Sequence, residues 1–204
     1  MDLAERFQIS RTPVREAIRR LVQDGLAVPV RESVRTQVVV APLTEADLGD
    51  LYTIMGALES AVGRHVRDLR APARKELATD LARANSKFEK LGRQRPPDFD
   101  RLFEAHNAFH SLFVERCGTP RLRAWIEQVR PQIDRYEFIY AALVGPNYEE
   151  SFAEHRAIVQ AFKDGSPAAI EESVRTNWVN GASRLAQAVR RLQPLGDYST
   201  ASTA

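Results

Sequence analysis

After residue 43, apolar residues recur every three or four positions over long stretches, which is the spacing of amphipathic helices. The pattern predicts helices over 45–69, 73–91, 98–116, 121–143, 149–163 and 167–192. A proline or a glycine, residues that end helices, lies in each interval between these ranges. Pro131 lies inside the fourth range, where it should bend the helix. This part of the chain is therefore predicted to be an all-α bundle, starting at Thr44 with Asp47 as a capping signal.

The first 42 residues follow a different pattern. A short helix is predicted over 2–7, with three residues facing inward: Leu3, Ala4 and Phe7. After a break, a second helix is predicted over 11–23, with an apolar stripe of Val14, Ala17, Ile18 and Leu21. Ser10 or Thr12 would cap this helix, and Gly25 would end it.

Two strand-like runs follow, over 26–30 and 36–40, joined by the charged stretch 31–35. Helix, tight break, helix and β-hairpin, in this order, indicate a winged helix-turn-helix. The chain is therefore predicted to be mainly α, with a DNA-binding domain over 1–42. An all-α bundle of about six helices would occupy 43–195, and 196–204 would form a flexible tail.

The excess positive charge lies entirely in the first of these parts. Residues 1–42 contain seven arginines and five acidic residues, which leaves 22 basic and 22 acidic residues in the remainder. The planar guanidinium of arginine suits phosphates and guanine edges better than the ammonium of lysine does. The distribution is consistent with a nucleic-acid partner for the N-terminal part, although solvated surface arginines would give the same count.

The composition excludes several other classes of protein. With 44% apolar residues the chain is able to bury a core, and its single cysteine, Cys117, rules out an internal disulfide. The N-terminus has no secretory pattern, and no stretch has the roughly 20 apolar residues that a membrane span needs. We therefore expect a cytoplasmic protein.

Polar residues interrupt the apolar stripes of three predicted bundle helices. His106 and His110 lie one turn apart on the stripe of 98–116, His155 lies on that of 149–163, and Asn177 on that of 167–192. Two histidines four positions apart can bind one metal ion, and a third histidine would complete a site with open positions. The alternative is a set of hydrogen-bonded core histidines. His65, the fourth histidine, is predicted at the surface or at a helix end.

The run from Leu3 to Leu21, and above all Ser-Arg-Thr-Pro-Val-Arg-Glu-Ala over 10–17, resembles the N-terminal domain of the GntR family of bacterial transcription regulators. The resemblance implies that 11–23 is the recognition helix. Its implied DNA contacts are Ser10 and Thr12 to phosphate, Arg11 and Arg15 to guanine, and Arg19 to the backbone.

This sequence departs from the family pattern in two places. The family has a further helix before this pair, and Met1 stands where many members have a DNA-contacting arginine, so the start is expected to be either truncated, or trimmed or disordered. The wing tip has no glycine, and Arg31 and Arg35 would take over its DNA contacts, with Glu32 opposing them.

The remainder of the chain resembles the FCD ligand-binding domain of the FadR subfamily, through Phe-His-Ser-Leu-Phe over 109–113, the run 117–122, and Glu-His-Arg-Ala-Ile over 154–158. Many members bind a divalent metal through an aspartate and three histidines, and the matching positions here are His106, His110, His155 and Asn177. Two of the four are substituted, which leaves a three-histidine site for zinc or nickel and makes manganese less favoured. The alternative is a metal-free pocket whose polar groups bind the effector directly.

The resemblance implies a ligand-responsive transcription regulator, more often a repressor, that binds a pseudo-palindromic operator as a homodimer. Its effector would be a small organic acid, a carboxylate. Met55 stands where many relatives have an arginine, which makes a highly anionic effector less favoured. Further residues are expected to line the pocket on the bent helix: Arg135, Tyr136 and Tyr140. The chain is not expected to be an enzyme. The alternatives are a regulator that senses the metal itself and a three-histidine hydrolase with Glu154 as its base.

Overall fold

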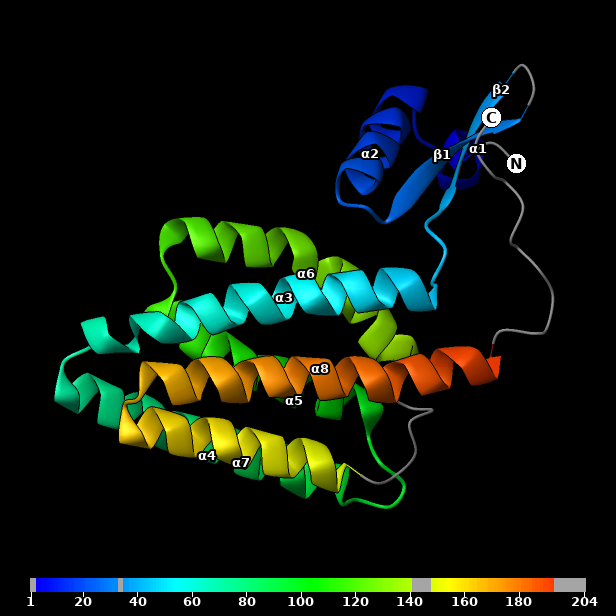
Figure 1. Cartoon of the computed structure of the whole chain (residues 1–204). Helices are drawn as coiled ribbons and strands as arrows, with labels where there is room; N and C mark the ends of the chain where they lie inside the picture. Colours follow the sequence, from blue (N-terminus) through cyan, green and yellow to red (C-terminus); the bar gives the residue numbers. More distant parts are fainter. Residues whose placement is uncertain (1–2, 33–34, 141–147, 193–204) are drawn as a thin grey trace.

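The computed structural model describes residues 3–32, 35–140 and 148–192. A small N-terminal unit stands beside a bundle of long helices (Figure 1). The predicted tail over 196–204 lies outside the described residues. Within them, no helix is both long enough and apolar enough to cross a membrane.

The N-terminal unit consists of α1 (Leu3–Phe7), α2 (Arg11–Gln23), β1 (Ala27–Glu32) and β2 (Arg35–Val40). The strands pair in antiparallel register, with Ala27 opposite Val40. Gly25, with φ of +69°, lets the chain reverse between α2 and β1 without steric strain. The predicted helix-turn-helix and hairpin are confirmed. Toward the tip of the hairpin, β1 extends two residues further than predicted and β2 one residue further.

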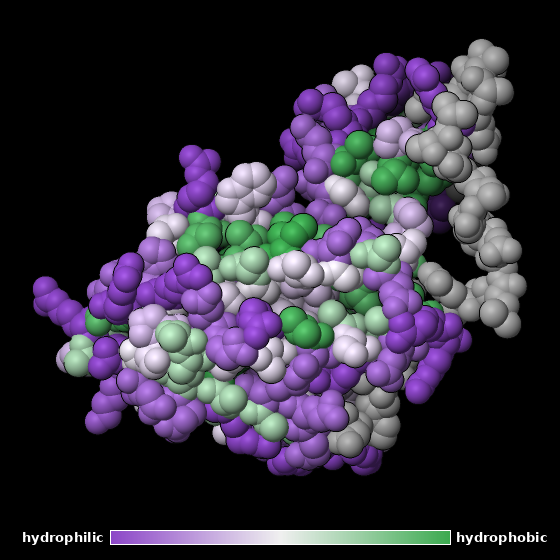
Figure 2. Space-filling model, in the orientation of Figure 1, coloured by the Kyte–Doolittle hydropathy of each residue, from purple (hydrophilic) through white to green (hydrophobic). Residues whose placement is uncertain are grey.

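The predicted inward faces of the N-terminal unit are only partly covered. Ala4 is buried as predicted, but Leu3 is 38% exposed and Phe7 62%, so the prediction that these two face inward was wrong. Leu21, on the apolar stripe of α2, is 44% exposed. Two short helices and a two-stranded hairpin are too small to cover one another on every apolar side. Figure 2 shows the resulting hydrophobic patch on this unit.

The bundle contains α3 (Glu45–Arg64), α4 (Ala71–Gly92), α5 (Phe99–Cys117), α6 (Pro120–Tyr140), α7 (Glu149–Asp164) and α8 (Pro167–Leu192). These bounds match the predicted helices closely, except that α3 ends five residues early. A 3-10 turn, η1 (His65–Asp68), follows it. The His65 ring lies at this helix end, 2.9 Å from the Asp68 carboxylate, so its predicted location is confirmed.

Helices α3 and α8 lie side by side through the middle of the bundle (Figure 1). Two glycines of α3 allow this close approach, because a Cβ on Gly56 would lie 3.0 Å from Trp178 and one on Gly63 would overlap Ile170. The remaining helices pack around this pair and bury a core that includes Phe109, to which the histidine-bearing faces of α5 and α7 contribute. The inward stripes predicted for α5, α7 and α8 are thus confirmed.

Candidate functional site

The three inward histidines meet at the centre of the bundle. His106 and His110 come from α5 and His155 from α7, and their ring centroids lie 4.8 to 5.3 Å apart. One ring nitrogen of each lies within 4.8 Å of the others. A zinc ion with bonds of about 2.1 Å holds its nitrogens no more than about 4.2 Å apart, so small side-chain adjustments would close this set around an ion.

His110 is oriented by a buried carboxylate. Its Nδ1 lies 2.7 Å from Oε2 of Glu59, which also accepts a hydrogen bond from the Trp178 indole at 2.8 Å, while Oε1 of Glu59 accepts from Arg130 at 2.7 Å. Because Nδ1 donates its proton to this carboxylate, Nε2 carries the lone pair, and it has no hydrogen-bond partner among the described residues. A histidine held by a carboxylate through one nitrogen, with the other nitrogen open, is the usual arrangement of a metal ligand.

His155 is fully buried, and neither of its ring nitrogens has a hydrogen-bond partner within the described chain. Its ring stacks on Phe109 with a centroid distance of 4.0 Å and an angle of 6°. Burial, together with the nearby His110 and His106, holds the pKa of His155 well below its usual range, so the ring is neutral. A neutral imidazole with two open nitrogens is costly to bury unless something else binds it.

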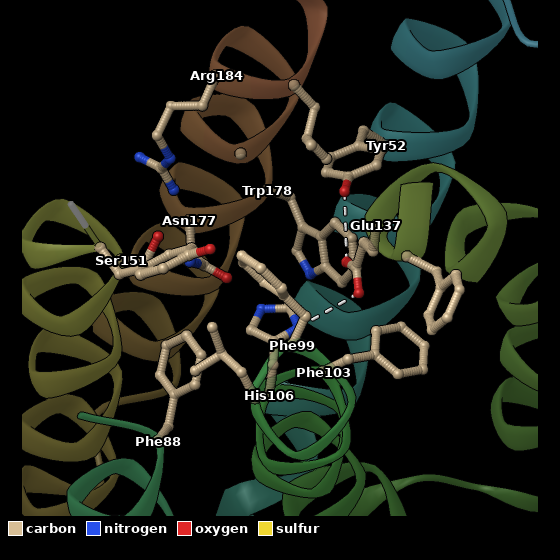
Figure 3. Close-up of a pocket in the computed structure, with 15 residues that line it drawn as sticks. Tyr52, Phe88, Phe99, Phe103, His106, Glu137, Ser151, Asn177, Trp178 and Arg184 are labelled. Atoms are coloured by element: carbon tan, nitrogen blue, oxygen red, sulfur yellow. Dashed lines mark hydrogen bonds and ion pairs between the residues drawn. The ribbon is translucent and has the colours of Figure 1, made fainter. Parts of the chain in front are cut away.

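His106 faces a second buried carboxylate. Its Nδ1 lies 3.3 Å from Oε2 of Glu137 on α6, and the Tyr52 hydroxyl donates to the other oxygen of Glu137 at 3.3 Å. Burial by itself would raise the pKa of Glu137, but His106 and Arg130 outweigh it and lower that pKa to about 2. Figure 3 shows Glu137 between His106 and Tyr52.

The two carboxylates were missed by the sequence analysis, although each left a signal. Glu59 lies one turn after Met55 on the buried face of α3, and Glu137 follows the buried Tyr136 on α6. An acidic residue on an apolar helical face needs a partner, and a search for such acids would have found both. They place negative charge beside His110 and His106, at a site where many family members have an aspartate among the ligands.

A pocket opens beside the histidine cluster, with a cavity volume of about 110 Å³ (Figure 3). His106 and Asn177 line it, whereas His110 and His155 lie behind its wall in the core. The side-chain amide of Asn177 donates to Glu154 at 2.9 Å. Both oxygens of Glu154 also accept from Arg184 at 2.8 Å, so this carboxylate is held by an ion pair at the pocket's edge.

Two residues expected in the pocket lie elsewhere. Arg135 donates to the backbone carbonyl of Ala41 at 2.6 Å, and the Tyr136 hydroxyl donates to Asp47 at 2.7 Å. Neither lines the pocket, and that prediction was wrong because α6 turns these two residues toward the linker before α3. The side chain of Tyr140 lies outside the described residues. Met55 is fully buried in the core, away from the pocket lining.

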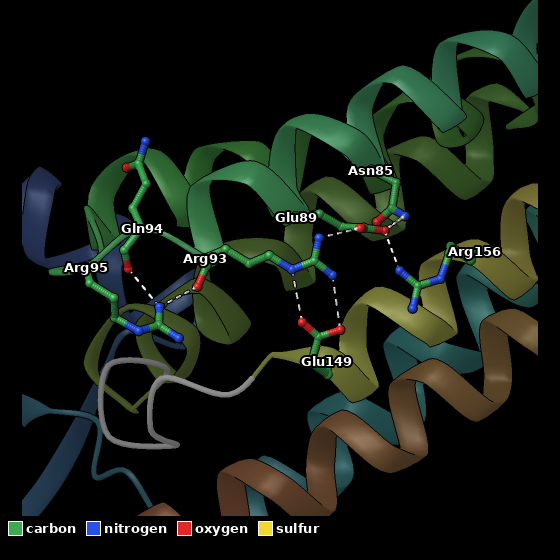
Figure 4. A network of polar contacts seen from close by, with 8 residues as sticks. Asn85, Glu89, Arg93, Gln94, Arg95, Glu149 and Arg156 are labelled. Carbon is green, nitrogen blue, oxygen red and sulfur yellow. Dashed lines mark hydrogen bonds and ion pairs between the residues drawn. The ribbon is translucent and has the colours of Figure 1, made fainter.

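A network of ion pairs joins α4 to α7 next to the pocket (Figure 4). The Arg93 guanidinium binds both oxygens of Glu149, at 3.0 and 3.1 Å, and lies over the Phe152 ring at 5.2 Å. Phe152 in turn packs edge-on against Phe88, which lines the pocket. These exposed ion pairs each contribute little to stability.

The predicted DNA-contacting residues whose side chains the structure describes are all exposed. Arg11, Arg15 and Arg19 follow one another at helical spacing on α2, and all three are exposed. Ser10 is the residue before the helix, and its side chain makes no capping hydrogen bond, while Thr12 is exposed in the first turn. Arg31 is exposed on β1; Arg35 begins β2, and its side chain lies outside the described residues.

The metal-free protein is expected to lose stability on acidification. Burial lowers the pKa of His110 and His155 from the ordinary value of 6.5, so below that pH the unfolded chain binds protons that the folded chain does not. The lowered pKa of Glu137 contributes stability that is complete above the ordinary glutamate pKa of 4.5 and is lost as the pH falls toward about 2. The urea concentration at the unfolding midpoint, measured in EDTA, should decrease as the pH is lowered from about 7.5 to 5.5. It should decrease less in His155→Gln. Midpoints that rise on acidification would contradict this.

The comparisons with known proteins agree with this architecture. The model for bacterial regulatory proteins of the gntR family matches residues 1–38, and the FCD domain model matches residues 50–178. An uncharacterized HTH-type transcriptional regulator in the TAR-I ttuE-ttuC' intergenic region of Agrobacterium vitis is 33% identical over 40% of this chain, a match that spans 46% of that protein. The uncharacterized HTH-type transcriptional regulator YdhC of Bacillus subtilis is 27% identical over 90% of this chain and 79% of its own length.

Solved structures show the same fold. A GntR family regulator from Pseudomonas syringae aligns with a TM-score of 0.57 and 25% identity, covering 92% of this chain and 74% of its own. McbR/YncC of E. coli aligns with a TM-score of 0.69 and 20% identity, covering 91% and 84%. The chain belongs to the gntR family of bacterial regulatory proteins, in the FadR subfamily whose members carry an FCD domain.

Proposed function

We propose that the chain is a ligand-responsive transcription regulator that reads an operator through α2 and responds to a small organic acid bound in the bundle. The observation that carries this is the pairing of two features in one chain of the gntR family. One is the exposed row Arg11, Arg15 and Arg19 on the second helix of a helix-turn-helix. The other is a pocket bordered by the histidine cluster in the FCD region.

A homodimer on a pseudo-palindromic operator fits the size of the reading element. The 13-residue α2 covers only a few base pairs, and a second copy related by two-fold symmetry doubles the contacts and the discrimination. We propose that the protein represses transcription and that effector binding releases it, because only one arrangement of the two winged units matches the spacing of the half-sites.

Selection of bound duplexes from a random library tests the DNA-reading proposal. We expect enrichment of an inverted repeat with half-sites about one helical turn apart. Binding to the selected duplex should exceed binding to a shuffled one by about 1,000-fold at physiological salt. Recovery of sequences with no common element would contradict the proposal.

His106, His110 and His155 fit a divalent metal, zinc or nickel, and we propose that they hold one. Three observations support the fit: converging ring nitrogens, open nitrogens on two buried rings, and buried carboxylates behind two of the rings. When bound there, the ion would act as a Lewis acid that holds the carboxylate of an effector. In its absence the same nitrogens would hydrogen-bond the effector directly.

Helix α6 links the pocket to the linker before α3. Glu137 lines the pocket, while the adjacent Tyr136 hydroxyl donates to Asp47 and accepts from the backbone N–H of Thr44, at 2.9 Å. Arg135, one residue earlier, donates to the carbonyl of Ala41 in the linker. A ligand that displaces Glu137 would thus move the residues that hold the linker, which is how we propose the signal reaches the winged unit.

Tyr136→Phe is expected to loosen the linker without unfolding the bundle. The substitution removes the hydroxyl's hydrogen bonds with Asp47 and Thr44, and we expect a loss of about 1–2 kcal/mol in the free energy of unfolding. Amide exchange should accelerate over residues 41–47 and stay unchanged in α5 and α7. Uniform acceleration through the bundle would show that Tyr136 acts as a general core residue instead.

A metal-sensing regulator is the second candidate, favoured by the open nitrogens of the buried His155. In that case operator affinity would follow zinc or nickel concentration with no organic ligand present. A hydrolase with Glu154 as its base has little support, because Arg184 and Asn177 occupy the oxygens of that carboxylate. We therefore do not propose an enzymatic activity.

A further inference from the structure

The walls of the pocket are largely aromatic. Aromatic side chains from five helices, α3 to α6 and α8, and from the residue before α7 line it: Tyr52, Phe88, Phe99, Phe103, Phe138, Tyr148 and Trp178. In Figure 3, Phe99 and Phe103 lie on the same side of the pocket as His106. Phe103 meets Phe138 edge-on at a centroid distance of 5.9 Å. Such a lining favours a flat apolar group, which it contacts through ring faces and edges.

Part of this aromatic surface is still exposed to solvent. Phe138 is 58% exposed and Phe99 is 40% exposed, although both line the pocket. Exposed aromatic surface at the wall of a concave site is removed from water when a ligand binds, and this favours binding of an apolar body. By contrast, the pocket residue Trp178 is buried, and its indole N–H already donates a hydrogen bond to Glu59.

The charged groups of the lining are already paired. Arg184 binds both oxygens of Glu154, and Glu137 faces His106 and Tyr52. A ligand with several carboxylates would bring its charges near the buried Glu137, while Arg184, the arginine that lines the pocket, is already paired with Glu154. A single carboxylate needs only one cationic partner, which the ion held by the three histidines would supply.

We propose that the effector is a small aromatic monocarboxylate, with its ring against Phe99, Phe103 and Phe138 and its carboxylate toward His106. The ring-binding part rests on the lining alone, whereas the carboxylate part rests on the proposed metal site. Phe103 is the specificity-determining residue, since it is half-buried, contacts Phe138 and lies one turn before His106.

Tryptophan fluorescence gives a direct readout of ligand binding. The chain has two tryptophans, and Trp125 is 50% exposed and outside the pocket, so Trp125→Phe leaves Trp178 as the single reporter in the pocket lining. The zinc-loaded variant is titrated with benzoate, phenylacetate and 3-phenylpropanoate, and with acetate and citrate. We expect at least one phenyl acid to saturate the signal with an affinity about tenfold or more above that of acetate and of citrate.

Phe103→Ala in the same background should weaken binding of the phenyl acid about tenfold and leave binding of acetate unchanged. Ile54→Ala is the matched control, because Ile54 is an exposed apolar residue on α3 outside the pocket. Citrate binding more tightly than all three phenyl acids, or an affinity for them that is insensitive to Phe103→Ala, would overturn the proposal.

The same samples separate this inference from the proposed function. Zinc content and affinity for the selected operator are measured on each variant. If phenyl acids still bind when zinc is removed, the ring-binding part of the proposal is supported, and the metal is not needed for it. If the protein binds the operator specifically but binds no phenyl acid, the inference is overturned and the regulator proposal stands. If the parent protein binds the operator no better than a shuffled duplex, the result counts against the regulator proposal only.

Discussion

Replacing Arg11 and Arg15 together by alanine is expected to lower affinity for the selected operator at least about 100-fold. Both side chains are exposed on α2 and lie one turn apart, so both can reach base edges in one major groove. Because the variant would lose the two proposed guanine contacts along with two charges, its affinity for a random duplex should fall much less than its affinity for the operator. The ratio of the two affinities, measured by fluorescence anisotropy at fixed salt, is therefore the quantity to compare.

Arg6→Ala combined with Arg20→Ala is the charge-matched control. Arg20 lies on the side of α2 opposite Arg11, and Arg6 lies at the end of α1, so the control removes two arginines without touching the proposed reading face. It should weaken binding to both duplexes to a similar, smaller extent and should keep the ratio. If the control and the Arg11, Arg15 variant lose specificity equally, α2 does not read the operator as proposed.

Zinc or nickel is expected to bind at one ion per chain and to raise the melting temperature of the metal-free protein by about 5–10 °C at saturating concentration. The reason is that the open nitrogens of His110 and His155, buried without hydrogen-bond partners among the described residues, gain a ligand only in the folded state. His155→Gln and His110→Ala should abolish this rise. The shift on adding metal is the readout, because either substitution also changes the stability of the metal-free core.

Two further variants make the metal test specific. Glu59→Gln should weaken metal affinity about 10- to 100-fold, since Glu59 orients His110 without contacting the ion. His65→Gln should bind metal like the parent, because His65 lies at the end of α3 and pairs with Asp68. A stoichiometry that falls in His65→Gln but not in His155→Gln would place the ion elsewhere.

The helices and the histidine cluster follow from the sequence because their signals are local. Apolar spacing, capping residues and prolines set the bounds of the bundle helices, and the same spacing put His106, His110 and His155 on inward faces. Since each stripe can point only toward the core, the convergence of three stripes was predictable without knowing how the helices cross.

The partners of those histidines were not predictable in the same way. Glu59 lies 51 residues before His110, and which turn of α3 faces which turn of α5 depends on the packing of the whole bundle. The orientation of Arg135 and Tyr136 likewise depends on how α6 continues past Pro131, which helical periodicity alone does not give. On the N-terminal unit, the spacing identified an apolar face on α1 but not whether any element covers it.

Native mass spectrometry of the protein mixed with the selected duplex tests the central claim most directly, because it counts chains, duplexes and metal ions in one complex. We expect two chains on one duplex with one ion per chain, and no such complex on a shuffled duplex of equal length. Equal binding to both duplexes would contradict the proposal that this chain reads DNA sequence.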